Sequence, residues 1–237
     1  MSHHYLRFDN VHYTYANGYE ALKGVSFRIN HGEKVALVGV NGAGKSTVVL
    51  HTNGLLLPRQ GSVNVGDIPV SKQTLPFIRQ TVGLVFQNPD DQLFMPTVEE
   101  DVAFGPVNMK LPAREVERRV SQALEAVGAS ALRHRAGYQL SGGQKKSVSI
   151  ATVLSMEPNI LVMDEPTSNL DPRARRHIIN LLASFEHTCF IATHDLNMVW
   201  ELCGRTIVMN DGHVVADRAT KDIFQDKEML KANGLEY

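Results

Sequence analysis

The sequence feature that most restricts the fold is a glycine-rich stretch between an apolar run and a helical pattern. Residues 39–46 read Gly-Val-Asn-Gly-Ala-Gly-Lys-Ser and match the pattern G-x-x-x-x-G-K-[ST]. The apolar run at 35–38 suits a strand buried on both faces, and a helix is predicted over about residues 44–55. In this context backbone N–H groups turn inward around phosphate oxygens, and the helix N-terminus adds partial positive charge. The stretch predicts an α/β fold that binds phosphate groups.

The residues of this loop have different expected roles. Lys45 can reach the β- and γ-phosphates of a nucleotide, and the Ser46 hydroxyl can hold Mg²⁺. An incidental glycine-rich turn is the alternative, and the flanking strand and helix argue against it. The remaining nucleotide-binding candidates are Gly39, Asn41, Gly42, Ala43, Gly44 and Thr47.

A second apolar run, residues 160–163, ends in two carboxylates, Asp164 and Glu165. Strand ends in open α/β sheets face the ligand crevice. We expect Asp164 to hold Mg²⁺ and Glu165 to orient or deprotonate an attacking water. A solvated acidic turn after a core strand is the alternative, and the upstream phosphate loop favours the catalytic interpretation.

The stretch Leu140-Ser141-Gly142-Gly143-Gln144 precedes this acid pair by about 20 residues and opens another predicted helix. Exposed N–H groups at a helix start, together with a serine hydroxyl, suit an anion. Alone the pattern is weak, because Ser-Gly-Gly also occurs in linkers.

Together these three elements resemble the ATP-binding-cassette (ABC) ATPases, and the resemblance covers essentially the whole chain. It implies that ATP and Mg²⁺ are the cofactors and that residues 140–144 are the family's signature. Gln87 stands where the family has a glutamine that contacts Mg²⁺ and water, and His194 where it has a histidine that contacts the γ-phosphate. For His194 the alternative is an ordinary turn at the end of a strand.

The resemblance also assigns two less specific positions. Asp171 ends the loop 168–171, which crosses the dimer interface in the family, although it would also serve as a plain helix N-cap before Pro172. Tyr15 resembles the aromatic residue that stacks on adenine, and Tyr13 is its rival because both point to the same face of a strand.

Two positions depart from the family pattern. Ser147 stands where an arginine is frequent, and Lys145 and Lys146 are alternative sources of positive charge. Asn169 replaces a common glycine, which is a mild change because asparagine tolerates a left-handed backbone.

The implied fold is a P-loop NTPase (RecA-like) core with an N-terminal antiparallel β region and an inserted helical subdomain. We expect residues 1–237 to form a single ABC ATPase domain, with 1–88 and 145–237 as the nucleotide-binding core. Residues 89–144 are expected to form the helical subdomain, with the signature at its end. A capping box at Thr97 and Glu100, and apolar residues at helical spacing from 116 to 127 before Gly128, support this.

Local patterns predict several further elements. Residues 5–15 are expected to form a strand pair, and Asn17-Gly18 a turn. Asp211-Gly212 is expected to turn a hairpin, and residues 221–230 to be helical.

Composition and sequence patterns argue against several classes of protein, namely nucleic-acid-binding, disulfide-linked and membrane-spanning proteins. The net charge of −1 and the pI of about 6.8 argue against nucleic-acid binding. Only two cysteines occur, which favours reduced thiols and a cytosolic setting. The sequence has neither a run of about 20 apolar residues nor a signal peptide pattern, so a membrane link is expected to go through a partner. We therefore expect peripheral attachment to the cytoplasmic face of the cell membrane.

The stretches 86–94 and 96–106 resemble the ATPases of energy-coupling factor (ECF) transporters, especially the cobalt-transport CbiO type. The resemblance implies a second ATPase subunit, in a homodimer or a paralogous heterodimer. It also implies a transmembrane coupling subunit and a substrate-binding membrane protein. Cobalt or nickel is the first expectation for the cargo and a vitamin the next, and another ABC importer is the alternative to an ECF transporter.

Two other classes fit less well. A soluble ABC ATPase acting on DNA would carry long coiled coils between Lys45 and Ser141, and no heptads occur there. A nucleotide kinase or GTPase would leave the signature unexplained, and a guanine-specific Asn-Lys-x-Asp element is missing.

Overall fold

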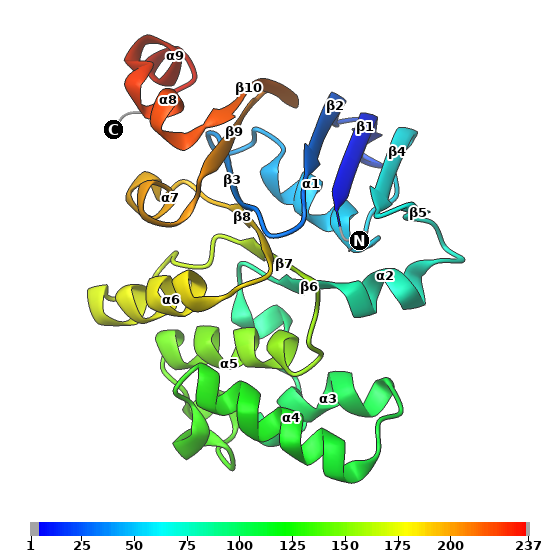
Figure 1. Ribbon diagram of the computed structural model, residues 1–237, viewed down its shortest axis with the longest axis vertical. Helices are drawn as coiled ribbons and strands as arrows, with labels where there is room; N and C mark the ends of the chain where they lie inside the picture. Colours follow the sequence, from blue (N-terminus) through cyan, green and yellow to red (C-terminus); the bar gives the residue numbers. More distant parts are fainter. Residues whose placement is uncertain (1–4, 236–237) are drawn as a thin grey trace. The chain divides into compact units, whose positions relative to one another are not determined.

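The computed structural model describes residues 5–235, which fall into two compact units (Figure 1). The first unit comprises the chain up to Val82, residues 159–165 and the chain from Glu186 onward. The second comprises residues 83–158 and 166–185. The expected division into a core of 1–88 plus 145–237 and a subdomain of 89–144 stays a prediction. Each unit is described by itself.

An antiparallel sheet forms the N-terminal part of the first unit. Its strands are β1 (Leu6–Thr14), β2 (Glu20–Ile29), β4 (Gln60–Val65) and β5 (Ile68–Pro69), in the order β2-β1-β4-β5. The prediction of a strand pair within residues 5–15 is wrong, because β1 is one strand whose partner begins at Glu20 after the predicted Asn17-Gly18 turn. Asn10, with φ 47°, makes a bulge where β1 changes register between Phe8 and Val11.

A second, largely parallel sheet carries the phosphate loop. Its strands in the first unit are β3 (Lys34–Val38), β7 (Ile160–Asp164), β8 (Thr188–Ala192), β9 (Arg205–Asn210) and β10 (His213–Ala219), in the order β10-β9-β3-β8-β7. Only β10 runs antiparallel to its neighbour here. Ala192 pairs with both Leu37 and Asp164. The carboxyl ends of β3, β8 and β7 therefore meet at one edge.

The helices of the first unit are short. They are α1 (Lys45–Thr52), α2 (Leu75–Thr81), α7 (Leu196–Leu202), α8 (Thr220–Gln225) and α9 (Lys227–Ala232). The tail predicted as one helical stretch forms two helices, because Asp226 ends α8 and caps α9 by accepting from Met229 N. The predicted hairpin is present, with φ of 43° at Asp211 and 77° at Gly212.

The second unit is mostly helical. Strand β6 (Val82–Val85) leads into it, and its short 3₁₀ turns are η1 (Pro89–Asp91), η2 (Ser130–Leu132) and η3 (Gly137–Gln139). Its α-helices are α3 (Val98–Asn108), α4 (Ala113–Ala126), α5 (Gly142–Leu154) and α6 (Pro172–Ser184). The capping box of Thr97 and Glu100 starts α3, and Gly128, with φ 66°, follows α4. Within residues 5–235 no helix is long and apolar enough to span a membrane.

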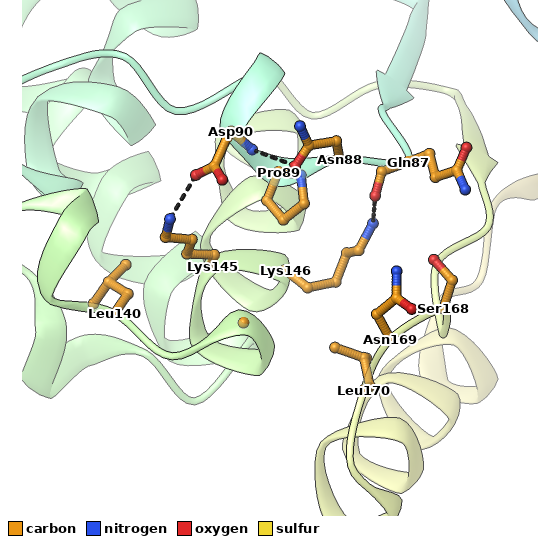
Figure 2. Close-up of a pocket in the computed structure, with 11 residues that line it drawn as sticks. Gln87, Asn88, Pro89, Asp90, Leu140, Lys145, Lys146, Ser168, Asn169 and Leu170 are labelled. Carbon is orange, nitrogen blue, oxygen red and sulfur yellow. Dashed lines mark hydrogen bonds and ion pairs between the residues drawn. The ribbon is translucent and has the colours of Figure 1, made fainter.

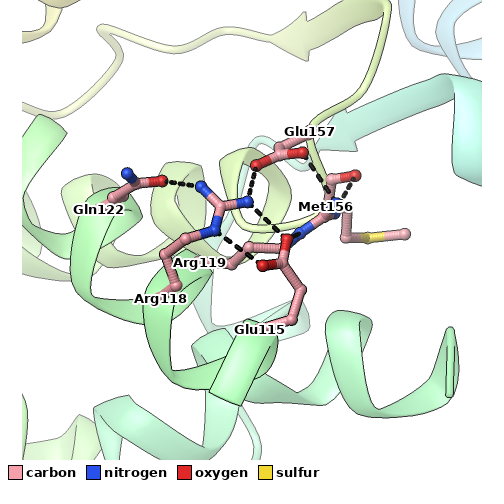
Figure 3. A network of polar contacts seen from close by, with 6 residues as sticks. All are labelled: Glu115, Arg118, Arg119, Gln122, Met156 and Glu157. Carbon is pink, nitrogen blue, oxygen red and sulfur yellow. Dashed lines mark hydrogen bonds and ion pairs between the residues drawn. The ribbon is translucent and has the colours of Figure 1, made fainter. Parts of the chain in front are cut away.

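Helices α3, α4 and α5 pack side by side, and two arginines of α4 join it to the chain after α5 (Figure 3). Arg119 donates to Glu115 and to Met156 O, and its guanidinium also lies 2.8 Å from a Glu157 oxygen. Arg118 bonds Glu115, Gln122 and Glu157. Hydrogen bonds from Arg118 and Arg119 lower the pKa of Glu115 to about 2.

This network gives a prediction about stability. The side chain of Arg119 is 14% exposed and that of Arg118 is 44% exposed. Arg119→Ala should lower the free energy of unfolding by about 1–2 kcal/mol, because Met156 O and two carboxylates lose a charged donor that is itself mostly buried. Arg118→Ala should cost less, since water replaces exposed ion pairs easily. Urea denaturation followed by circular dichroism measures both variants, and an equal or larger loss for Arg118→Ala would contradict the assignment.

Candidate functional site

The phosphate loop is packed closely against neighbouring backbone. A Cβ at Gly39 would lie 2.4 Å from Met209 O, and one at Gly44, which has φ 102°, would lie 2.7 Å from Ala21 O. Gly212 N donates to Ala43 O at 3.1 Å. Only glycine fits these two positions, so the spacing of the motif reflects the close approach of β2 and the β9–β10 turn.

Lys45 begins α1 and is almost fully buried within the loop. Its Nζ donates to Gly39 O at 2.8 Å and to Val40 O at 3.2 Å. Burial lowers the pKa of Lys45, and the negative charges of Glu165 and Asp164 act in the opposite direction. A phosphate oxygen would compete with the two carbonyls for this ammonium group. The next residue, Ser46, is exposed.

Glu165 and His194 form a direct pair at the edge where β7 and β8 end. His194 Nδ1 lies 2.9 Å from Glu165 Oε1, and Thr193 Oγ1 donates to Glu165 Oε2 at 3.1 Å. The Glu165 side chain is 7% exposed, whereas that of His194 is 63% exposed. Glu165 has φ 47°, a conformation that non-glycine residues adopt at a cost and that is frequent in functional sites. The buried carboxylate is thus oriented by donors, beside an imidazole open to solvent.

Asp164 ends β7 and is 7% exposed. The strand register places it at the same sheet edge as the end of β3, from which the phosphate loop leaves. Asp164 and Ser46 offer a carboxylate and a hydroxyl, the oxygen ligands that suit Mg²⁺. The donor set of the first unit therefore fits this ion.

Tyrosine side chains approach the phosphate loop and α1. Tyr15 OH lies 3.0 Å from Thr47 Oγ1. Tyr13 packs edge-on against the buried His51 of α1, with ring centroids 4.8 Å apart, so it already has a packing role. Tyr19, which the sequence analysis missed, donates from its OH to Gly42 O at 3.1 Å and is 49% exposed. In the sequence, only the position of Tyr19 directly after the Asn17-Gly18 turn could have indicated that it lies near the phosphate loop.

The signature residues form the start of α5 in the second unit. Ser141 Oγ accepts from Gln144 N at 3.3 Å, and Gln144 Oε1 accepts from Ser141 N at 2.9 Å. Gly142 is exposed, and a Cβ there would have open space. At Gly143 a Cβ would lie 2.8 Å from the Ala174 Cβ of α6. The four residues thus make a capped helix start with an accessible first turn.

Asp171 is the N-cap of α6. Its Oδ1 accepts from Arg173 N and Ala174 N, both at 2.9 Å, so the capping role considered in the sequence analysis is present. Asn169 has φ 59°, the left-handed conformation that made asparagine a mild replacement for glycine. A role at a dimer interface stays a prediction.

Gln87 lies two residues beyond β6 and is exposed. It lines a cavity of about 380 Å³ together with the start of α5 and the loop that precedes α6 (Figure 2). Its lining also includes Gly142, Lys145, Lys146, Ser168 and Asn169.

The predicted site residues thus fall into two groups. The first unit brings together Tyr15, the loop Gly39–Thr47, Asp164, Glu165 and His194. The second unit contains Gln87, Ser141–Gln144 and Asp171.

Comparison with known proteins gives consistent matches. Residues 22–168 match the family model described as ABC transporter. An ABC transporter ATP-binding protein of Geobacter sulfurreducens is 59% identical over 236 residues, which cover 100% of this chain and 95% of that protein. The ECF transporter ATP-binding protein EcfA of Methanothermobacter thermautotrophicus is 46% identical, over 97% of this chain and 76% of its own.

Among solved structures, CbiO1 of Clostridium perfringens, described as part of the ABC transporter complex cbiONQ, has a TM-score of 0.84 and 40% identity. The match covers 98% of this chain and 94% of CbiO1. The fold expected from the sequence is confirmed. The chain belongs to the ABC transporter family, as an ATP-binding, ATP-hydrolysing subunit homologous to those of energy-coupling factor transporters.

Proposed function

We propose that this ATPase energises an ECF-type importer by hydrolysing ATP at the group of residues in its first unit. The observation that carries the proposal is the buried Glu165 carboxylate, held by Thr193 and His194 at the sheet edge that also carries the phosphate loop. A buried structural acid also needs donors, so the feature that favours catalysis is the place of this carboxylate, at the sheet edge that carries the phosphate-binding loop. Such positioning is what phosphoryl transfer to water requires.

In this proposal the chain's own residues divide the work. The loop amides and Lys45 bind the phosphate chain, and Lys45 exchanges its bonds to Gly39 O and Val40 O for phosphate oxygens. Glu165 accepts a proton from the attacking water, and His194 binds the γ-phosphate. Ser46 and Asp164 are proposed to hold Mg²⁺, which when bound neutralises phosphate charge. By its resemblance to the family, Gln87 is proposed as the glutamine that contacts Mg²⁺ and water. Tyr15 is proposed to stack on adenine, with Tyr13 less favoured because it packs on His51.

A second ATPase subunit would complete each site. The first turn of α5, Ser141–Gln144, is a capped helix N-terminus with open space at Gly142 and suits an anion held by another subunit. Asp171 is proposed to contribute from the adjacent loop. The partner is a second copy or a paralogous chain, and both arrangements agree with the complete set of motif residues.

The proposed attachment site for the membrane partner is a groove next to η1. A cavity of about 330 Å³ is lined by residues of 90–96, of 136–138 and by Lys145. Phe94 and Tyr138 beside it are 63% and 85% exposed, an apolar surface that suits the face of a short amphipathic helix. Asp90 at the rim is 62% exposed and pairs with Lys145 at 2.6 Å. Asp91 is exposed and adds a second carboxylate for a partner arginine.

For the cargo we propose a transition-metal ion, cobalt or nickel. The support is the similarity to CbiO1, together with the stretch 86–106 that resembles that branch. A vitamin importer of the same type is the second candidate, since EcfA proteins are also similar. The chain would then work on the cytoplasmic face of the membrane, attached through the coupling subunit.

Two substitutions test the proposed roles of Glu165 and Lys45 in hydrolysis and ATP binding. Glu165→Gln should reduce ATP hydrolysis by about 10²–10⁴-fold, because an amide cannot accept the proton, and should leave ATP binding intact. Lys45→Ala should instead weaken ATP binding about 10–100-fold, since a charged hydrogen bond of about 1.5–3 kcal/mol is lost. Phosphate release and equilibrium ATP binding separate the two effects. Phosphate release by Glu165→Gln near the wild-type rate would refute the role of Glu165.

Substitutions at Asp90 and Asp91 test the proposed attachment to the coupling subunit. Asp90→Lys or Asp91→Lys should weaken association with the coupling subunit by about 2–5 kcal/mol, because a carboxylate that pairs with a partner arginine is replaced by a like charge. Basal ATP hydrolysis by the isolated protein should stay largely unchanged. Co-purification from cells that make all subunits measures the association, and Glu125→Lys on the exposed face of α4 controls for the change in charge.

An unchanged yield of the complex with both aspartate variants would show that Asp90 and Asp91 form an ordinary solvated turn and do not hold the coupling subunit.

The same complex, reconstituted in lipid vesicles, also tests the cargo. ATP-dependent uptake of Co²⁺ or Ni²⁺ is expected, and uptake of a vitamin without either ion would favour the second candidate.

A further inference from the structure

A lysine lies almost completely inside the second unit. Lys146 is 1% exposed and is among the largest fully buried side chains of the described residues. Its Nζ donates to Gln87 O at 2.7 Å (Figure 2). It also donates to Phe86 O at 3.1 Å. Lysine is rarely buried to this extent, because taking the ammonium group out of water is costly. A lysine that stays buried must therefore be compensated by the hydrogen bonds that its ammonium group donates.

The two acceptors explain why a long donor is needed there. Phe86 and Gln87 lie just beyond the end of β6, which is Val82–Val85. Carbonyl groups that are partly shielded from water at such a point are stabilised when a donor reaches them. Lys146 extends from the second turn of α5 and supplies that donor to two successive carbonyls. The orientation of the Gln87 peptide group is thereby fixed from α5.

Neighbouring contacts fasten the same segment to the same helix. Gln92 Oε1 accepts from Phe86 N at 3.1 Å, and its Nε2 donates to Ser149 O and Thr152 Oγ1, both at 2.7 Å. Lys145 pairs with Asp90. Residues 86–92 are therefore attached to α5 at three points, of which only Lys146 contacts Gln87 itself.

We infer that Lys146 is a positioning residue for Gln87, which links the signature helix α5 to the proposed Mg²⁺-contacting side chain. The inference rests on the proposed role of Gln87. Lys146 is two residues beyond Gln144, so a shift of the first turn of α5 on engaging the partner subunit's nucleotide passes through Lys146 to the Gln87 backbone. Hydrolysis would then depend on both the signature and Gln87 being in place. This places the positive charge of Lys146 in the interior, where it does not substitute for the arginine missing at Ser147.

The test compares Lys146→Met, which keeps the length of the side chain and removes the donor, with Lys146→Gln, which keeps an N–H donor. Lys146→Met should lower kcat about 10-fold and raise the Mg²⁺ concentration for half-maximal activity, while ATP affinity changes less than about 2-fold. Lys146→Gln should recover part of both losses. Hydrogen exchange at residues 86–88 should increase in Lys146→Met. Val148→Ala, which shortens a buried side chain of the same helix, should lower the Tm without shifting the Mg²⁺ requirement.

The decisive comparison is made in a Gln87→Ala background. If Lys146 acts through Gln87, Lys146→Met should change kcat there by less than about 2-fold, because the two losses are not additive. A full additional loss, or an unshifted Mg²⁺ requirement in Lys146→Met and Lys146→Gln, overturns the inference while leaving the proposed function standing. If Lys146→Met does not fold, the Lys146→Gln series decides alone. Wild-type hydrolysis by Gln87→Ala would instead refute the proposed role of Gln87, and the inference with it.

Discussion

The parallel register of β3, β8 and β7 is the constraint on which the proposed catalytic group depends. Ala192 faces Leu37 on one side and Asp164 on the other, so the phosphate loop and the acid pair leave the sheet at the same edge. The backbone continues this register for one more step, because Glu165 N donates to Ala192 O at 2.8 Å. The left-handed turn at Glu165 then directs its carboxylate to Thr193 and His194 at the end of β8. The strain of this conformation is offset by hydrogen bonds that a different strand order would not supply.

The second unit solves a different problem, which is to keep loops in a defined arrangement beside a helix N-terminus. Ser141 and Gln144 cap each other, and Asp171 caps α6. Residues that resemble ligand-binding positions in the family therefore also have structural roles in the isolated chain. The two roles are compatible, since a capping side chain still leaves the remaining N–H groups of the first turn available to an anion. Lys146 also has a structural role near the signature, because its buried ammonium group holds the backbone of Gln87.

Motifs with a local physical cause were predictable from the sequence. The glycine spacing of 39–46 indicated a strand, loop and helix, and the Asp211-Gly212 turn and the Thr97 capping box follow from backbone preferences. The predicted strand pair at residues 5–15 is a single strand, because a bulge at Asn10 lets the chain continue in β1 without turning back.

Long-range contacts were beyond the sequence alone. The hydrogen bond of Tyr19 to Gly42 needs the fold of β1 and β2, and the contact of His194 with Glu165 needs the order of the strands. Lysine is normally assigned to the surface, so nothing in the sequence indicated that Lys146 is buried while Lys145 is not.

In the proposed dimer, each ATP is bound by the phosphate loop of one subunit and the signature of the other. This shared site is tested most directly by counting the ATP retained by dimers that carry Lys45→Ala and Ser141→Arg in two arrangements. With the changes on opposite subunits, both lesions fall in one site, and the dimer should retain one ATP molecule after free nucleotide is removed. With both changes on one subunit and a wild-type partner, each site is damaged and little ATP should remain. Equal retention in the two arrangements would contradict a site shared between subunits.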